Sequence, residues 1–334
     1  MLVLQQIFSN RIKGSPTIVT LSMQYIGLSI AFSFMVLLAL VGNTLVILVF
    51  FLNKSMRTAM NRLVLNLAIA DMMVAIFVAI QFVIGPMYEH IPGTTGKLLC
   101  KFITGGTLTW TAALVSVCNL VAISVERYHA VLQPLTSRSK LTKTKLKLII
   151  SGCWLTGCLW NAPLFVAVTF RDDLGTCGER WPDAILPIAY SLGWSAVAGI
   201  IPIGIMSYLY SRVVYQLWFE TTPARQSASV QKATISRKRA TVTVIAVSVI
   251  YVICWIPVLV MYLLAQSLPN QMVYSVDHKI TILLAMFNSS INPVVYSFTS
   301  SRFRQHVAKL FRCECSTMKF ATRLRVLRGL CHAK

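Results

Sequence analysis

Acidic residues are scarce in this chain of 334 residues, which has 10 Asp and Glu against 31 Lys and Arg. Charged residues make up only 12% of the sequence, about half of the usual share in soluble domains. This composition excludes an ordinary soluble surface. The five histidines are scattered without the spacing of a metal site, and no grouping of residues is typical of catalysis. We therefore do not expect an enzyme.

Long uncharged stretches fill much of the chain, of which 56% is hydrophobic. They span residues 14–53, 63–87, 102–125, 148–170, 184–211, 240–276 and 280–301, and the second is interrupted only by Asp71. Each provides the roughly 20 residues that a membrane-spanning helix needs. The stretches are too long, and lack the period-2 alternation, for a transmembrane β-barrel. The sequence predicts an all-α membrane protein built as a bundle of seven transmembrane helices.

Most Lys and Arg residues lie in the loops after the first, third and fifth stretches and in the carboxyl-terminal tail. Cytosolic loops carry such an excess of basic residues, so we expect the amino terminus outside and the tail in the cytosol. The net charge of +21 is therefore a topology signal. Because the charge is divided among four segments, we expect no nucleic-acid partner, whereas the tail is expected to hold acidic lipid headgroups.

The expected organisation has four parts. These are an extracellular amino terminus (1–24), the seven-helix domain (25–300), a short amphipathic eighth helix (301–313) and a basic cytosolic tail (314–334). In the eighth helix, Phe303, Val307 and Leu310 share one side and basic residues occupy the other. This pattern is typical of a helix that lies on the membrane surface.

Two of the nine cysteines, Cys100 and Cys177, are expected on the oxidising side of the membrane, and the others lie within spans or on the tail. Extracellular cysteines usually form disulfides. We therefore expect a Cys100–Cys177 disulfide, with two free thiols as the alternative.

Asp71 is a lone carboxylate in an apolar stretch. A charge at the centre of a membrane helix costs about 2.5–3.5 kcal/mol, so it usually faces the protein interior and meets a partner there. The candidate partners are polar residues of other spans: Asn43, Ser116, Asn288, Ser289 and Asn292. The alternative for each polar residue is a local bond between two helices.

Seven motifs occur in order along the chain. They are Gly42-Asn43, the run from Asn66 to Asp71, Glu126-Arg127-Tyr128, Trp154, Pro202 with Tyr210, Cys254-Trp255-Ile256-Pro257, and Asn292-Pro293-Val294-Val295-Tyr296. With these motifs the chain resembles the rhodopsin-like (class A) G-protein-coupled receptors over nearly its whole length. The resemblance implies a plasma-membrane receptor that binds an extracellular ligand and activates heterotrimeric G proteins, with arrestin as a further partner.

The resemblance also assigns roles in activation. Arg127 is expected to pair with Glu126 at rest and to be released toward Tyr210 and the G protein. Pro257 is expected to kink the sixth helix below Trp255, and Pro293 to loosen the seventh so that Tyr296 can move. Pro134 and Leu135 resemble the turn and apolar knob that fit the G protein, with a simple helix terminator as the alternative.

Two further features follow from the resemblance. The cluster around Asp71 is expected to bind a sodium ion that stabilises the resting state, and no other cofactor is expected. Cys313 and Cys315, after the amphipathic helix, are candidates for palmitoylation, with unmodified thiols as the alternative.

The chain departs from the family pattern at three places. Cys100 precedes Arg127 by two more residues than expected, and Gly105-Gly106 is the expected place where the excess is absorbed. Arg237-Lys238-Arg239 stands where many relatives carry an acid that pairs with the third-helix arginine, so we expect above-average basal signalling. Tyr251 replaces the usual phenylalanine near Trp255.

The ligand class is first narrowed by what the outer halves of the spans lack. The third span has no acid to pair with an amine, since either register places a threonine (Thr107 or Thr109) there, and the seventh has Met286 in place of a retinal-binding lysine. Asp172, Asp173 and Glu179 make the loop before the fifth span acidic, which would steer a cation.

The spans also resemble neuropeptide receptors, for example at 54–58. We expect a short basic or amidated peptide ligand. One alternative is that the acids only solvate the loop, with a lipid or another small non-amine ligand instead. The other is a seven-helix transporter, although no internal repeat is present.

Overall fold

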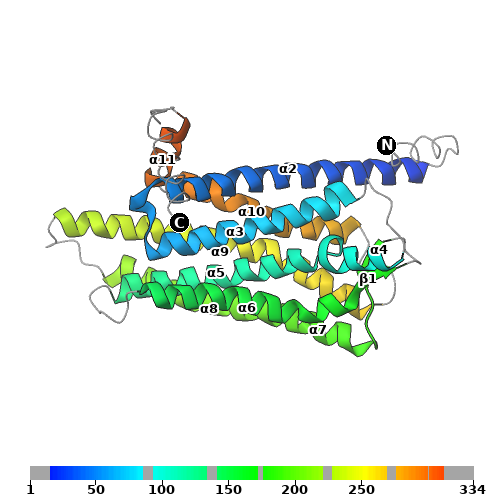
Figure 1. Cartoon of the computed structure of the whole chain (residues 1–334). Coiled ribbons are helices and arrows are strands. Elements are labelled where there is room, and N and C mark those ends of the chain that lie inside the picture. Colours follow the sequence, from blue (N-terminus) through cyan, green and yellow to red (C-terminus); the bar gives the residue numbers. More distant parts are fainter. Residues whose placement is uncertain are drawn as a thin grey trace, which may run out of the picture.

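The computed structural model describes residues 16–85, 93–133, 141–171, 176–220, 228–268, 276–299 and 301–311. Seven helical segments in this part are long and apolar enough to cross a membrane. They run Ile26–Leu52, Ala59–Ile84, Gly93–Leu132, Lys143–Ala167, Ile185–Phe219, Arg237–Ser267 and Val276–Phe298, and pack side by side as a bundle (Figure 1). Each overlaps one of the seven predicted stretches, so the predicted fold of a multi-pass membrane protein is confirmed.

The helices are α2 (Pro16–Leu52), α3 (Ala59–Val78), α4 (Gly93–Leu99), α5 (Thr107–Leu132), α6 (Lys143–Ala167), α7 (Ile185–Ser195), α8 (Ile201–Tyr215), α9 (Ala228–Ser267), α10 (Val276–Thr299) and α11 (Ser301–Phe311). Short 3₁₀ or π-helical turns are η1 (Lys54–Met56), η2 (Ala79–Ile84), η4 (Cys100–Thr104), η6 (Ala196–Ile200) and η7 (Gln216–Glu220). Strands β1 (Val168–Arg171) and β2 (Thr176–Glu179) form an antiparallel hairpin. Helix α2 begins at Pro16, within residues 1–24, which were expected to form the extracellular amino terminus.

The bundle exposes large apolar side chains on its outside and buries polar ones inside, as expected for a protein in a membrane. Large apolar side chains are exposed on the outside, as at Leu148, Leu155 and Leu159 along α6, where a bilayer would cover them. Asn43, Asp71 and Asn119 are buried within the bundle. Helix α5 contacts α3, α6, α8 and α9, so residues on it can link most of the other helices.

The span that contains α5 is interrupted at Gly105-Gly106, where the two excess residues were expected to be absorbed. The π-helical turn η4 precedes the break, and Gly106 has a left-handed φ of 82°. A Cβ on Gly105 would lie 2.3 Å from both the Cys100 carbonyl oxygen and a Val168 methyl group. Only glycine fits this close approach of helix and hairpin.

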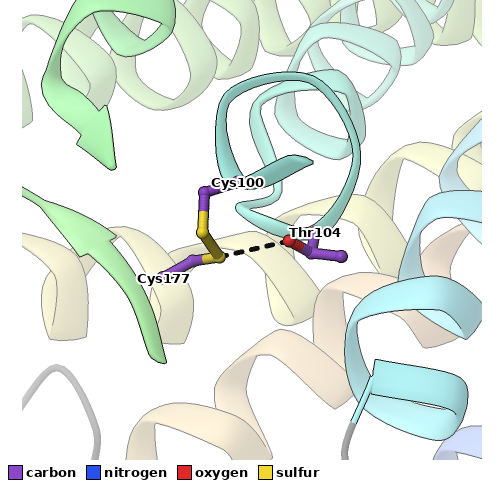
Figure 2. Close-up of a disulfide and its surroundings, with 3 residues drawn as sticks. All are labelled: Cys100, Thr104 and Cys177. Carbon is purple, nitrogen blue, oxygen red and sulfur yellow. Dashed lines mark hydrogen bonds between the residues drawn. A yellow bond between two sulfur atoms is a disulfide. The ribbon is translucent and has the colours of Figure 1, made fainter. Parts of the chain in front are cut away.

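The Cys100–Cys177 disulfide is present and joins η4 to β2 (Figure 2). Thr104 Oγ1 lies 3.1 Å from Cys177 Sγ. In Figure 1 the hairpin and the start of α2 lie at one end of the bundle, here called the hairpin end, and α11 lies at the opposite end.

Helix α11 corresponds to the predicted amphipathic helix. Phe303 is buried, and Val307 and Leu310 pack against the same core. Arg304 Nη1 donates to the carbonyl oxygens of Ser297 and Phe298, so it satisfies backbone groups at the end of α10.

Candidate functional site

An aromatic cavity lies among the helices at the hairpin end. It is lined by Trp110, Leu164, Glu179, Trp194, Trp255, Val258, Leu259, Tyr262 and His278. These residues come from α5, α6, β2, α7, α9 and α10, so the cavity forms only when distant parts of the chain pack together. A concave, largely apolar lining with a few polar groups is typical of a small-molecule or peptide side-chain site.

Three indole rings form one wall of this cavity. The Trp194 and Trp255 rings are stacked with centroids 6.3 Å apart, and Trp110 packs edge-on against both, at 6.0 and 6.5 Å. Trp255 was predicted from its motif, whereas Trp110 and Trp194 were missed. A tryptophan within an apolar stretch has no local signal that separates a cavity wall from ordinary core packing.

Glu179 is the carboxylate in the wall of the aromatic cavity. It accepts hydrogen bonds from Trp181 Nε1 (2.8 Å), Tyr262 Oη (3.1 Å) and Gln266 Nε2 (3.0 Å). Burial raises the pKa of Glu179 above its usual range, and the three donors act in the opposite direction. These donors are neutral, so they satisfy the oxygens without balancing the negative charge.

The Asp71 carboxylate is completely buried near the middle of the bundle. Ser116 Oγ donates to Oδ1 (2.9 Å), and Asn292 Nδ2 donates to Oδ2 (2.8 Å). Asn43 Nδ2 donates to the backbone oxygen of Ser289 at 3.2 Å. The structure therefore gathers α2, α3, α5 and α10 around this carboxylate.

Three buried amide oxygens of this cluster, Oδ1 of Asn43, Asn288 and Asn292, have no hydrogen-bond partner among the described residues. A second cavity adjoins Ser116, Asn288 and Ser289 and shares Trp110 and Trp255 with the aromatic cavity. Such oxygens with free lone pairs are the ligands that hard cations prefer. The residues present thus fit a sodium ion, and the cavity reaches Ser116, which donates to Asp71.

The structure assigns the other polar motif residues to helix packing. Asn66 Nδ2 donates to Asn119 Oδ1 at 2.9 Å, and Trp154 Nε1 donates to Asn66 Oδ1 at 3.0 Å. These bonds join α3, α5 and α6. They correspond to the alternative given above for polar residues in the spans, a local bond between two helices.

Comparison with known proteins identifies the family to which this seven-helix architecture belongs. The pattern of the 7 transmembrane receptor (rhodopsin family) matches residues 42–296. The chain belongs to this family. Its relatives include a QRFP-like peptide receptor of Branchiostoma floridae, 30% identical over 289 residues that cover 83% of this chain and 75% of the relative.

Two further relatives have similar coverage. Neuropeptide FF receptor 1 of Homo sapiens is 28% identical over 306 residues, which cover 85% of this chain and 69% of the relative. Allatostatin-A receptor of Bombyx mori is 29% identical over 292 residues, which cover 85% and 79%. The protein is thus a receptor rather than an enzyme or a transporter.

The receptor's Arg127 lies near the end of α5 and forms an ion pair with Glu126 on the same helix. This is the pairing expected at rest, and Tyr128 follows in the motif. The Tyr210 hydroxyl is engaged with Ser124 at 2.5 Å and Ser248 at 3.0 Å. The two serines were not predicted, because a serine within a span usually bonds only to its own backbone.

The motif prolines lie inside or at the start of the receptor's helices. Pro257 is inside α9 and Pro293 inside α10, whereas Pro202 follows η6 at the start of α8. Tyr296 is buried. A Cβ on Gly42 would lie 2.9 Å from the Pro293 ring, so Gly42 allows α2 to pack closely against α10.

Six predicted site residues lie outside the described part of the receptor. They are Pro134, Leu135, Asp172, Asp173, Cys313 and Cys315. Their assigned roles stay predictions.

Proposed function

We propose that this receptor recognises a short basic or amidated peptide outside the cell and activates heterotrimeric G proteins at the plasma membrane. The observation that carries the proposal is the half-buried Glu179 carboxylate, which lies in an aromatic wall and is held by neutral donors among the described residues. The relatives named above as peptide receptors favour a peptide over the lipid alternative. In this orientation the hairpin end is extracellular and α11 is cytosolic.

A cationic group suits this cavity for two physical reasons. It would compensate the charge of Glu179, which is otherwise expensive to bury. It would also be attracted to the faces of Trp110, Trp194 and Trp255. An amidated terminus adds hydrogen-bond donors and removes the carboxylate that Glu179 would repel. Asp172 and Asp173 would steer the peptide toward the mouth.

Signal transfer would begin at Trp255, because this side chain lines both cavities. A ligand that moves Trp255 would act on α9 at the Pro257 kink and on the polar cluster of Asp71. Release of Arg127 would then open the cytosolic side to a G protein, with Pro134 and Leu135 as further contacts and arrestin as a second partner.

Two proposals concern smaller partners. A sodium ion at Asp71, with oxygens of Ser116, Asn288 and Asn292, would stabilise the resting arrangement. On the cytosolic side, α11 and the basic tail would bind acidic lipids, and Cys313 and Cys315 would carry palmitoyl groups.

Glu179→Gln tests the peptide proposal in the full-length receptor, screened against a peptide library with several G-protein sensors. Loss of one charge-assisted bond is expected to reduce the potency of basic peptides by about 10- to 100-fold. Asp277→Asn is the matched control, because Asp277 is an exposed acid at the start of α10 near the same end. Equal potency at wild-type and Glu179→Gln receptors would remove the proposal, as would activation by lipids alone.

A further inference from the structure

We propose that Ser124 and Ser248 are positioning residues that hold the Tyr210 hydroxyl at rest and thereby restrain α9. This hydroxyl chain would take the place of the ion pair that many relatives form between their third and sixth helices. The inference can be tested by basal G-protein activation, which rests on the proposed function, and by hydrogen–deuterium exchange, which does not.

The hydroxyl chain of Ser124, Tyr210 and Ser248 joins three helices through their side chains. Ser124 is on α5, Tyr210 on α8 and Ser248 on α9, with oxygen–oxygen distances of 2.5 and 3.0 Å. All three residues are buried, with exposed fractions of 0%, 8% and 5%. Hydrogen bonds that are shielded from water in this way are stronger than exposed ones.

The donors in the chain can be assigned because each hydroxyl has one proton. Ser124 Oγ donates to the Leu120 carbonyl oxygen at 2.7 Å. Tyr210 must then donate to Ser124. Ser248 Oγ lies within reach of two acceptors, Tyr210 Oη at 3.0 Å and Met206 Sδ at 3.5 Å, and its proton is assigned to Tyr210 because a thioether sulfur is the weaker acceptor. The chain therefore ends on a backbone carbonyl of α5, and movement of α9 away from α8 would remove the bond from Ser248.

Among the described residues, no ion pair links α5 to α9. Arg127 is engaged by Glu126, its neighbour on α5, so that ion pair does not connect two helices. Helix α9 carries the basic residues Arg237, Lys238 and Arg239 where an acid would be needed to pair with Arg127, and Lys238 lies over the Trp218 ring of η7. Because α9 is basic here, hydrogen bonds between neutral hydroxyls can link it to α5 and α8, whereas an ion pair with Arg127 cannot.

The hydroxyl chain also explains how the resting receptor could be held back from activation. Tyr210 is expected to turn toward Arg127 when the receptor opens, and its hydroxyl cannot do so while both serine bonds are intact. Loss of either serine should free Tyr210 and shift the unliganded receptor toward the open arrangement.

The test compares Ser248→Ala and Ser124→Ala with the wild-type full-length receptor, without ligand and at equal surface expression. Basal G-protein activation per receptor is expected to rise about two- to tenfold, the factor that corresponds to one hydrogen bond. Hydrogen–deuterium exchange across residues 237–251 of the purified receptor should rise with it. Ser248→Thr keeps a hydroxyl and should behave as wild type.

Thr243→Ala is the matched control, because Thr243 Oγ1 on α9 donates only to the Arg239 carbonyl of its own helix. A comparable rise in this control would overturn the proposal, as would unchanged basal activity and exchange in both serine variants. Poor folding of one serine variant leaves the other to decide. If exchange rises in a receptor that activates no G protein, the positioning role stands and the proposed signalling fails.

Discussion

Single side chains in this receptor are placed by the need to satisfy buried polar atoms. Asp71 and Tyr210 are buried, Glu179 is half-buried, and each has specific hydrogen-bond partners. The side-chain oxygens of Asn43, Asn288 and Asn292 are among the buried polar atoms that have no hydrogen-bond partner in the described part of the chain. The proposed sodium ion beside Asp71 would remove this penalty for these three oxygens.

Asp71→Asn tests the sodium site at the residue scale. Sodium chloride, exchanged for potassium chloride at constant ionic strength, should stabilise the purified wild-type receptor by about 1.4 kcal/mol at ten times the dissociation constant. The variant should gain nothing, because the amide lacks the charge that attracts the ion. Thermal unfolding measures both, and a sodium-dependent gain in the variant would contradict the site.

Irregular turns, rather than straight helices, bring the functional residues together at the scale of elements. The break at Gly105-Gly106 sets the register of Trp110 relative to the disulfide, and η6 presents the Ala198 carbonyl oxygen to the Tyr251 hydroxyl. The tyrosine that departs from the family pattern thus ties α9 to the turn above Pro202.

Tyr251→Phe should lower the free energy of unfolding by about 1 kcal/mol, because a buried hydrogen bond is lost with little change in shape. Tyr208→Phe on α8 is the control, since that ring is 62% exposed. Chemical or thermal denaturation in detergent gives the comparison. An unchanged or higher stability would show that this bond does not stabilise the α9–η6 contact.

At the scale of the whole molecule, the Cys100–Cys177 disulfide cross-links the hairpin to the bundle. The disulfide closes a separation of 77 residues, and Glu179 lies two residues beyond Cys177. The same link therefore stabilises the fold and fixes the charge in the aromatic cavity.

Replacing both cysteines, Cys100→Ser with Cys177→Ser, should reduce stability by about 4 kcal/mol in the chain-entropy description. Peptide potency should fall as well, because Glu179 is no longer held. Cys158→Ser, at an exposed free cysteine of α6, should change neither. Surface expression and ligand response measure the outcome, and full response in the double variant would separate the disulfide from the ligand site.

The sequence by itself determined the seven spans, the cysteine pair and most partners of Asp71. Span positions follow from composition along the chain, because a bilayer selects apolar length. Ser116 and Asn292 were found because a lone carboxylate in such a span needs a polar partner. The tertiary structure alone decided that Trp110 and Trp194 line a cavity with Glu179, and that Ser124 and Ser248 hold Tyr210. These contacts depend on how each helix is rotated and where helices cross, and no local pattern of residues encodes that.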